Sequence, residues 1–245
     1  SRSAALSFRH NSIAVGAGKI FCIDSLSPAK MFYITRRGYK PMTKSVLYAL
    51  DGKTGREIWR KDEGVFGTWL GYSEEYDALL QAGARSRDRS MDEVHRGMTV
   101  YRGNDGKVLW SQPRIDHRGP CMLHHRTILT QMFALDLLTG EPVLREHPIT
   151  GQKVPWTFRR MYGCNSVIAG EHLLTFRSAA AGFFDLLRGG TGNMGGFKSG
   201  CTSNLIPADG VLNAPDYTRT CECSYQNQCS LAMIHMPDAD EWTFS

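Results

Sequence analysis

The chain has 245 residues, of which 42% are hydrophobic and 22% are charged. This composition is that of an ordinary globular protein with a buried core, and it excludes an intrinsically disordered chain. The formal net charge of +5 includes no basic run dense enough to follow a phosphate backbone, so we expect no nucleic-acid partner. No apolar run approaches the roughly 18 to 20 residues that cross a bilayer, so we expect no membrane span.

The decisive pattern along the chain is an internal repeat in three copies, at residues 46–59, 98–110 and 132–144. Each copy is an apolar strand, a glycine turn and a second strand, which is the pattern of a β-hairpin. The turn glycines lie at spacings that bracket the roughly 40 to 50 residues of a four-stranded propeller blade.

Other short apolar segments with turn residues between them supply further strands, and none has a sustained helical period. A polar, charged stretch near residues 85–96 is predicted to be an inserted loop, and residues 166–177 begin a later blade as strand, glycine turn and strand. The remaining predicted strands are residues 12–15, 19–24, 78–82 and 127–130.

The sequence therefore predicts an all-β chain of four-stranded antiparallel propeller blades, about four to five over residues 1–245, ending in a Cys-rich closing region at 197–245. Closed propellers have typically 4 to 8 blades. Because the chain starts abruptly inside strand-like sequence, we expect a partial ring or the C-terminal part of a larger propeller. An N-terminal segment or a second polypeptide would complete it.

The spacing Ala49-x-Asp51-x-x-x-Gly55-x-x-x-Trp59 resembles the tryptophan-docking motif of the quinoprotein alcohol dehydrogenase repeat, a pyrroloquinoline-quinone-like propeller family. The resemblance implies that the Trp packs between neighbouring blades while the Asp and Gly shape the turn. We expect Trp59 and Trp110 to be buried at equivalent positions. The predicted docking residues are Asp51, Gly55, Trp59, Gly106, Trp110, Asp136 and Gly140.

The C-terminal block at 156–244 resembles the end of large secreted, planctomycete-type members of this repeat family, through residues 196–201, 215–221 and 224–228. The family includes dehydrogenases, assembly lipoproteins and uncharacterised extracytoplasmic proteins. The resemblance therefore implies a bacterial, extracytoplasmic propeller without selecting an activity.

Seven cysteines are many for a cytosolic protein of this length, and they favour an oxidising compartment, periplasmic or secreted. A four-thiolate zinc site is the alternative, but the paired Cys-x-x-Cys spacing that builds such sites is missing. We therefore predict at least one disulfide and no metal, with one thiol left over because the number is odd. The disulfide candidates are Cys164, Cys201, Cys221, Cys223 and Cys229.

The dehydrogenases that the chain resembles stack their quinone on a disulfide between adjacent cysteines. This chain has no such pair, its nearest approach being Cys221 and Cys223, and it has no Cys-x-x-Cys-His for haem attachment. We expect no cofactor on this chain, with pyrroloquinoline quinone and Ca²⁺ as the less favoured alternative.

A ligand-binding face is predicted in residues 215–228, where nearly every side chain can form hydrogen bonds. Tyr217, Arg219, Tyr225 and Asn227 share one parity and would share one face of an extended strand, suited to a sugar ring or a carboxylate. The alternative is that these groups satisfy one another in a buried polar network.

Two further clusters are weighed against ordinary structural roles. His124 and His125 are neighbours on a predicted strand, where successive side chains point to opposite faces, so at most one would serve a given site. The glycine-rich residues 188–196 match no nucleotide-binding fingerprint and are predicted to form tight turns.

The sequence favours an extracytoplasmic β-propeller that acts as a binding or scaffold module for a glycan or protein partner. The alternative is an enzyme domain with an active site in the central funnel, polysaccharide-acting or a quinoprotein-like oxidoreductase. Whether the chain is an enzyme stays open, because no nucleophile, metal or cofactor pattern is complete.

Overall fold

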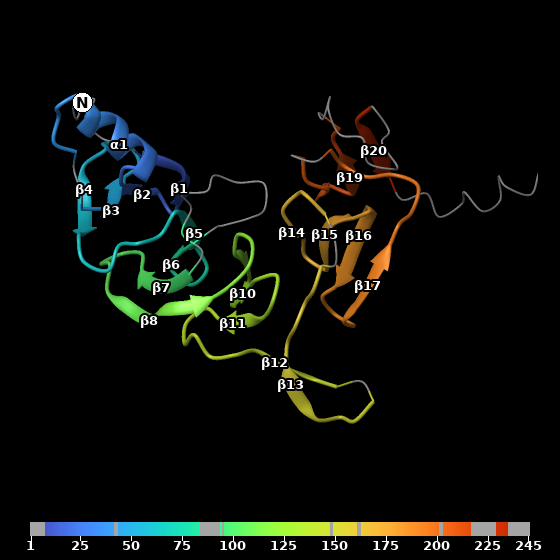
Figure 1. Cartoon of the computed structure of the whole chain (residues 1–245). Helices are drawn as coiled ribbons and strands as arrows, with labels where there is room; N and C mark the ends of the chain where they lie inside the picture. The colour runs from blue at the N-terminus through green and yellow to red at the C-terminus, as the bar shows by residue number, and fades with distance from the viewer. Residues whose placement is uncertain are drawn as a thin grey trace, which may run out of the picture. The chain divides into compact units, whose positions relative to one another are not determined.

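The computed structural model describes residues 8–41, 44–83, 94, 96–147, 149–160, 163–200, 203–216 and 229–234. These residues form six antiparallel sheets and one helix, so the predicted all-β fold class is confirmed (Figure 1). The chain divides into two compact units, Ser1–Phe158 (unit 1) and Arg159–Ser245 (unit 2). No helix in the described part of the chain is long and apolar enough to cross a membrane.

Unit 1 contains two four-stranded sheets in which spatial order follows chain order, a three-stranded sheet and a separate hairpin. The first sheet is β1 (Phe8–Gly16), β2 (Lys19–Asp24), β3 (Val46–Asp51) and β4 (Glu57–Lys61). The second is β5 (Trp69–Ser73), β6 (Ala78–Ala82), β7 (Arg96–Arg102) and β8 (Val108–Asp116). The third is β9 (Met122–His124), β10 (Thr127–Leu129) and β11 (Ala134–Asp136), and the hairpin is β12 (Leu144–Glu146) with β13 (Lys153–Pro155).

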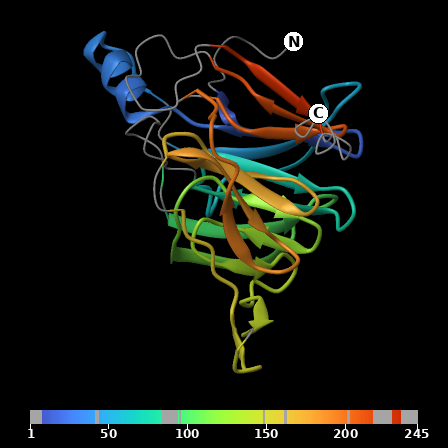
Figure 2. The same cartoon turned by 90° about the vertical axis from the view of Figure 1, so that its right-hand side faces the viewer.

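Unit 2 contains one four-stranded sheet and one three-stranded sheet, again in chain order. The first is β14 (Ile168–Ala169), β15 (Leu173–Ser178), β16 (Ala180–Asp185) and β17 (Gly190–Asn193). The second is β18 (Ile206–Ala208), β19 (Val211–Ala214) and β20 (Leu231–Ile234). Figure 2 shows the same strands from the side. Up-and-down four-stranded sheets are the blades of a propeller.

Helix α1 (Pro28–Arg36) was not predicted, because its sequence has no apolar helical period. It is an insertion between β2 and β3, and none of its residues is buried. The local start signal is present: the Ser27 side chain accepts a hydrogen bond from the Lys30 amide at 3.2 Å, and Pro28 occupies the first turn. Of the predicted inserted loop at 85–96, only Val94 and Arg96 are described, and Arg96 is the first residue of β7.

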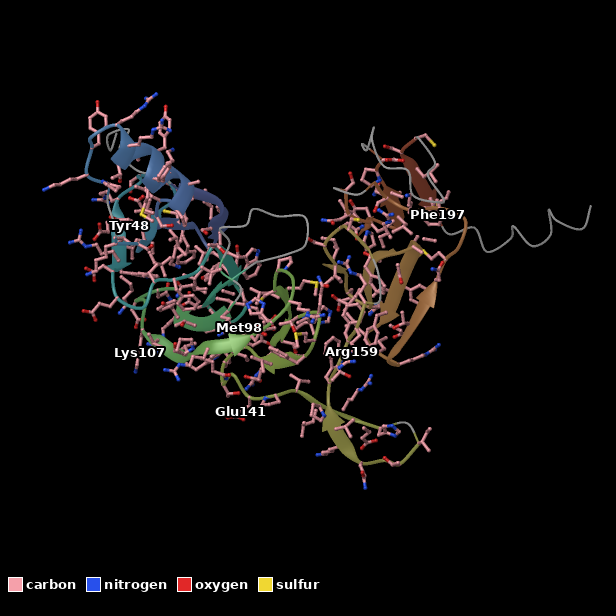
Figure 3. All side chains as sticks on the ribbon, in the orientation of Figure 1. Tyr48, Met98, Lys107, Glu141, Arg159 and Phe197 are labelled. Atoms are coloured by element: carbon pink, nitrogen blue, oxygen red, sulfur yellow. The ribbon has the colours of Figure 1, made fainter. Side chains whose placement is uncertain are left out.

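The core of unit 1 lies on both faces of the second sheet. On one face of the second sheet, Leu79 and Tyr101 pack with Phe21 and Leu47 of the first sheet. The opposite face of the second sheet packs in a cluster with residues of the third sheet. Met98, labelled in Figure 3, belongs to that second cluster with Leu80, Val100, Ile128 and Leu135. The second sheet is therefore buried on both faces between its neighbours, as a blade is.

Two tryptophans link consecutive sheets of unit 1. The Trp59 indole on β4 donates a hydrogen bond to the Gly103 carbonyl at 2.8 Å, in the β7–β8 turn of the next sheet. The Trp110 indole on β8 donates to the Leu137 carbonyl, also at 2.8 Å, beside the third sheet. Both indoles are half-buried rather than fully buried, because each lies on the last strand of its sheet. Neither indole is exposed, and each is bonded to the neighbouring sheet.

One turn geometry recurs through the chain. The carboxylate of Asp51 accepts hydrogen bonds from the backbone N–H groups of Lys53 and Thr54, and Gly55 has a positive φ of 67°. Asp136 with Gly140 repeats this turn, and so does Asp185 with Gly189, a copy that the sequence repeat had not revealed. Positive φ favours glycine because a Cβ is strained there. In the β12–β13 hairpin, a His147 ring nitrogen accepts the equivalent amides.

Candidate functional site

A groove of about 700 Å³ lies in unit 2 and is lined by residues of both of its sheets and of the turns between their strands. Its walls are mainly apolar, and they come from four segments that are far apart in the sequence. The lining residues are 170–173 in the β14–β15 turn, Met194 and Phe197 after β17, 207–212 in the β18–β19 hairpin, and Met233 and Ile234 of β20.

Turn chemistry shapes two of these walls. Asp209 and Gly210 connect β18 to β19 with positive φ values of 49° and 76°, as an Asp-Gly hairpin turn requires. Gly170 lies so close to Pro207 that a Cβ at residue 170 would meet its ring at 3.3 Å. The β14–β15 turn therefore contacts the first strand of the last sheet, and the groove has a defined end there.

Backbone hydrogen bonds hold the third wall in place. The Met194 amide donates to the Ala181 carbonyl at 2.8 Å, and the Ala181 amide donates to the Phe197 carbonyl at 2.7 Å. The segment between them folds back through Gly195 and Gly196, both with positive φ. The glycine-rich residues 188–196 are thus β17 and its tight turns, and they position Met194 and Phe197 at the groove.

A polar cluster in unit 2 joins Asn165 and β15 to the segment between β17 and β18. The Asn165 side chain donates to the Ser199 hydroxyl at 2.8 Å and to the Ser203 carbonyl at 3.1 Å, and it accepts the Arg177 amide. The Thr175 hydroxyl donates to the Leu205 carbonyl at 2.7 Å. These bonds tie Ser199, Ser203 and Leu205 to Asn165 and β15. Buried polar groups that satisfy one another in this way hold the segments that they join in place.

Lys198 stands beside this cluster and is only 2% exposed. Its ammonium nitrogen has no hydrogen-bond partner among the described residues. Burying a cation that has no hydrogen-bond partner costs free energy, so the Lys198 ammonium is expected to lower the stability of unit 2.

The groove has few charged groups, and they are exposed. The polar side chains of Glu171, His172 and Asp209 are exposed at the rim. The other side chains that line the groove are apolar. Ile234 is 63% exposed although it is aliphatic. A concave surface with an apolar floor and few polar groups binds apolar side chains better than it binds an ion.

Among the described strands, β20 is an edge strand, and it lies along the same groove. Each complete sheet has four strands in chain order, whereas β20 is the third strand of its sheet and no described strand pairs with its outer side. In an antiparallel ladder every second residue directs its N–H and C=O groups toward such an edge. Unpaired groups of this kind accept an added strand.

The ligand face predicted from the sequence lies outside the described residues, since Tyr217, Arg219, Tyr225 and Asn227 all fall in 217–228. It therefore stays a prediction. The unit-2 groove is a different surface, and all its lining residues except Met233 and Ile234 precede residue 217. No local motif marked it, because its members meet only in the folded unit.

The cysteines show no disulfide among the described residues. Cys164 and Cys229 are free thiols, and so are Cys22 and Cys121, whose burial raises their pKa to about 11 and about 12. Three of the disulfide candidates, Cys201, Cys221 and Cys223, lie outside the described residues. The predicted disulfide stays a prediction.

The expectation for the histidine pair was wrong. His124 ends β9, but His125 begins the turn to β10 with a positive φ of 48°, so the two do not alternate as strand neighbours do. Their rings meet edge to face, with centroids 4.7 Å apart. Both imidazoles therefore lie together at the tip of one hairpin.

The described strands define the class of protein as an all-β chain of four-stranded antiparallel blades. No protein-family model and no curated protein matches the chain. The structure is similar to that of BamB from Moraxella catarrhalis, with 17% sequence identity and a TM-score of 0.48, over 82% of this chain and 53% of that chain. The chain thus spans about half the length of that protein.

Two dehydrogenases are also similar in structure. A europium-containing methanol dehydrogenase has 12% identity and a TM-score of 0.37, over 83% of this chain and 44% of that chain. A quinohemoprotein alcohol dehydrogenase from Pseudomonas putida HK5 has 12% identity and a TM-score of 0.38, over 96% of this chain and 48% of that chain.

Proposed function

We propose that the chain is an extracytoplasmic binding module built of propeller blades, and that the unit-2 groove binds an extended, apolar segment of a protein partner. The segment would add to the outer edge of β20 as a fourth strand. Its apolar side chains would lie in the groove against Phe197, Met233 and Ile234. Strand addition takes affinity from backbone hydrogen bonds and specificity from the side-chain pockets beside them.

The observation that carries the proposal is the coincidence of an apolar groove with a strand edge that no described strand covers. Ile234 belongs to both, as the last residue of β20 and as part of the groove wall. An unpaired strand edge by itself does not select among extended chains, and an apolar groove by itself does not select among apolar groups. Together they select an extended chain with apolar residues at alternate positions.

A protein segment fits this surface better than a glycan. Sugar rings are held by aromatic faces together with hydrogen-bonding groups, whereas among the described residues that line the groove only Phe197 carries a large apolar ring. Tyr217, Arg219, Tyr225 and Asn227 remain the predicted face for a glycan or a carboxylate. The enzyme alternative, with or without pyrroloquinoline quinone, also stays a prediction, and so does completion of the ring by another segment or polypeptide.

The test uses a short synthetic peptide, capped at both ends, in which valine and threonine alternate and lysines provide solubility. Fluorescence anisotropy measures its binding to the full chain. Ile234→Asp and Met194→Asp each place a carboxylate in the groove, and we expect each to weaken binding about tenfold or more, since burying an unpaired charge is costly.

Leu187→Asp is the matched control, because Leu187 is an exposed leucine of unit 2 that does not line the groove. It should leave the affinity for the peptide unchanged. Absence of saturable binding by the unaltered chain, or an equal loss in the control, would contradict the proposal. Fractionation of the native host tests the extracytoplasmic location separately.

A further inference from the structure

Helix α1 lies at one end of the unit-1 sheets rather than between them (Figures 1 and 2). It has no buried residue, and only Met31 and Ile34 are half-buried on the side toward the sheets. An amphipathic helix of a globular protein normally buries one apolar stripe. The helix and the residues that follow it, 28–40, are here called the α1 patch.

The outward side of the α1 patch is aromatic. Phe32 is 69% exposed, Tyr33 is 52% exposed, and Tyr39 is 68% exposed. Packing within unit 1 does not explain these rings, because none of them is buried there. Exposed large apolar groups in one place mark an interaction surface.

The α1 patch is also strongly basic. It contains Lys30, Arg36, Arg37 and Lys40, and no aspartate or glutamate between residues 25 and 41. None of the four cations forms an ion pair with a described residue. Arg37 stacks on the Tyr33 ring, 4.2 Å from its centroid, which keeps cation and aromatic ring together at the surface.

We propose that the α1 patch binds the surface of a membrane rich in anionic lipid. Aromatic rings enter the interface between headgroups and acyl chains, while lysine and arginine pair with anionic headgroups. An acidic protein surface would satisfy the charges, but a helix of nine residues is only about 13 Å long. A stable protein interface buries about 800 Å² of each partner, which is more than so short an element offers alone.

Co-sedimentation with vesicles tests the proposal on the full chain. Vesicles of phosphatidylcholine with phosphatidylglycerol should pellet the protein, whereas pure phosphatidylcholine should not. Arg36→Gln with Lys40→Gln should reduce the partition coefficient about tenfold or more, because each cation near an anionic surface contributes on the order of 1 kcal/mol. The control is Lys53→Gln with Lys107→Gln, the same charge change on exposed turns of unit 1.

The aromatic contribution has its own pair of variants. Phe32→Ser with Tyr39→Ser should reduce vesicle binding at raised salt, while Val15→Ser with Leu144→Ser, which alters exposed apolar residues elsewhere in unit 1, should not. All these positions are exposed, so the variants should melt as the unaltered chain does. The proposal fails if anionic vesicles do not pellet the protein or if both members of a pair act alike. Tighter binding to soluble polyglutamate, independent of Phe32, would identify an acidic protein surface instead.

Discussion

The six-membered ring of Trp110 lies directly over Gly140, so that a Cβ at residue 140 would meet the indole Cδ2 atom at 2.7 Å. Trp59 lies over Gly106 in the same way, with a Cβ-to-ring distance of 2.9 Å. Each tryptophan of one sheet therefore packs on the turn glycine of the next, while its indole N–H bonds a carbonyl of that turn region. The glycine serves both the turn and the docking.

The two roles of glycine can be separated by alanine substitution. Gly55 and Gly140 occupy equivalent turns with φ values of 67° and 73°, but a Cβ at residue 55 meets nothing within 4 Å. Gly55→Ala should cost about 1 to 2 kcal/mol in the free energy of unfolding, from positive φ alone. Gly140→Ala should cost about 1 to 3 kcal/mol more, because the Cβ collides with Trp110. Equal losses in urea denaturation would contradict the docking role.

A double-mutant cycle tests the contact itself. Trp110→Ala should cost about 3 kcal/mol, the low end for a large aromatic, since the indole is half-buried. In that background the added cost of Gly140→Ala should fall toward the cost of Gly55→Ala. The coupling free energy should therefore be about 1 to 3 kcal/mol, and additivity within about 0.5 kcal/mol would refute the contact.

Lys198 gives a prediction of the opposite sign. Lys198→Met keeps the length of the side chain and removes a buried ammonium that has no partner among the described residues. The variant should be more stable than the unaltered chain by about 1 to 3 kcal/mol. Lys53→Met, at an exposed turn, should change stability by less than about 0.5 kcal/mol. A clear loss of stability in Lys198→Met would show that the ammonium is satisfied.

The aspartate turns predict an acid sensitivity. The Thr54 hydroxyl and backbone amide donate to Asp51 at 2.6 and 2.7 Å, and they hold the pKa of its carboxyl below its ordinary value. A lowered pKa in the folded state stabilises the fold above the unfolded value, near pH 4, and this contribution is lost as the pH falls through the folded pKa. Asp51→Asn should therefore lower Tm at neutral pH, and its difference from the unaltered chain should shrink below about pH 4. A difference independent of pH would contradict this.

Much of the fold could be predicted from the sequence because β-hairpin signals are local. Residues 78–82 coincide with β6, and residues 19–24 coincide with β2, since each strand carries its own apolar pattern and turn residues. Helix α1 was not predicted because a helix that buries no residue needs no periodic apolar pattern in its sequence. The Ser27-Pro28 pair at its start was the one local helix signal.

The groove could not be predicted in the same way. Gly170, Met194, Pro207 and Met233 line one surface only because the two sheets of unit 2 pack together, which is a tertiary relationship. The Asp209-Gly210 turn was the one local signal available. The position of His125 could not be predicted from strand alternation either. Its positive φ takes it out of the strand, so its ring lies beside that of His124.

Amide hydrogen exchange in β20 tests the proposed function most directly. When the alternating valine–threonine peptide is added, the fragment that contains Leu231–Ile234 should exchange more slowly, because amides at its open edge gain hydrogen bonds to the added strand. In the Ile234→Asp variant the same peptide concentration should give little added protection. Unchanged exchange in β20 of the unaltered chain, at a peptide concentration that saturates binding, would contradict strand addition at this groove.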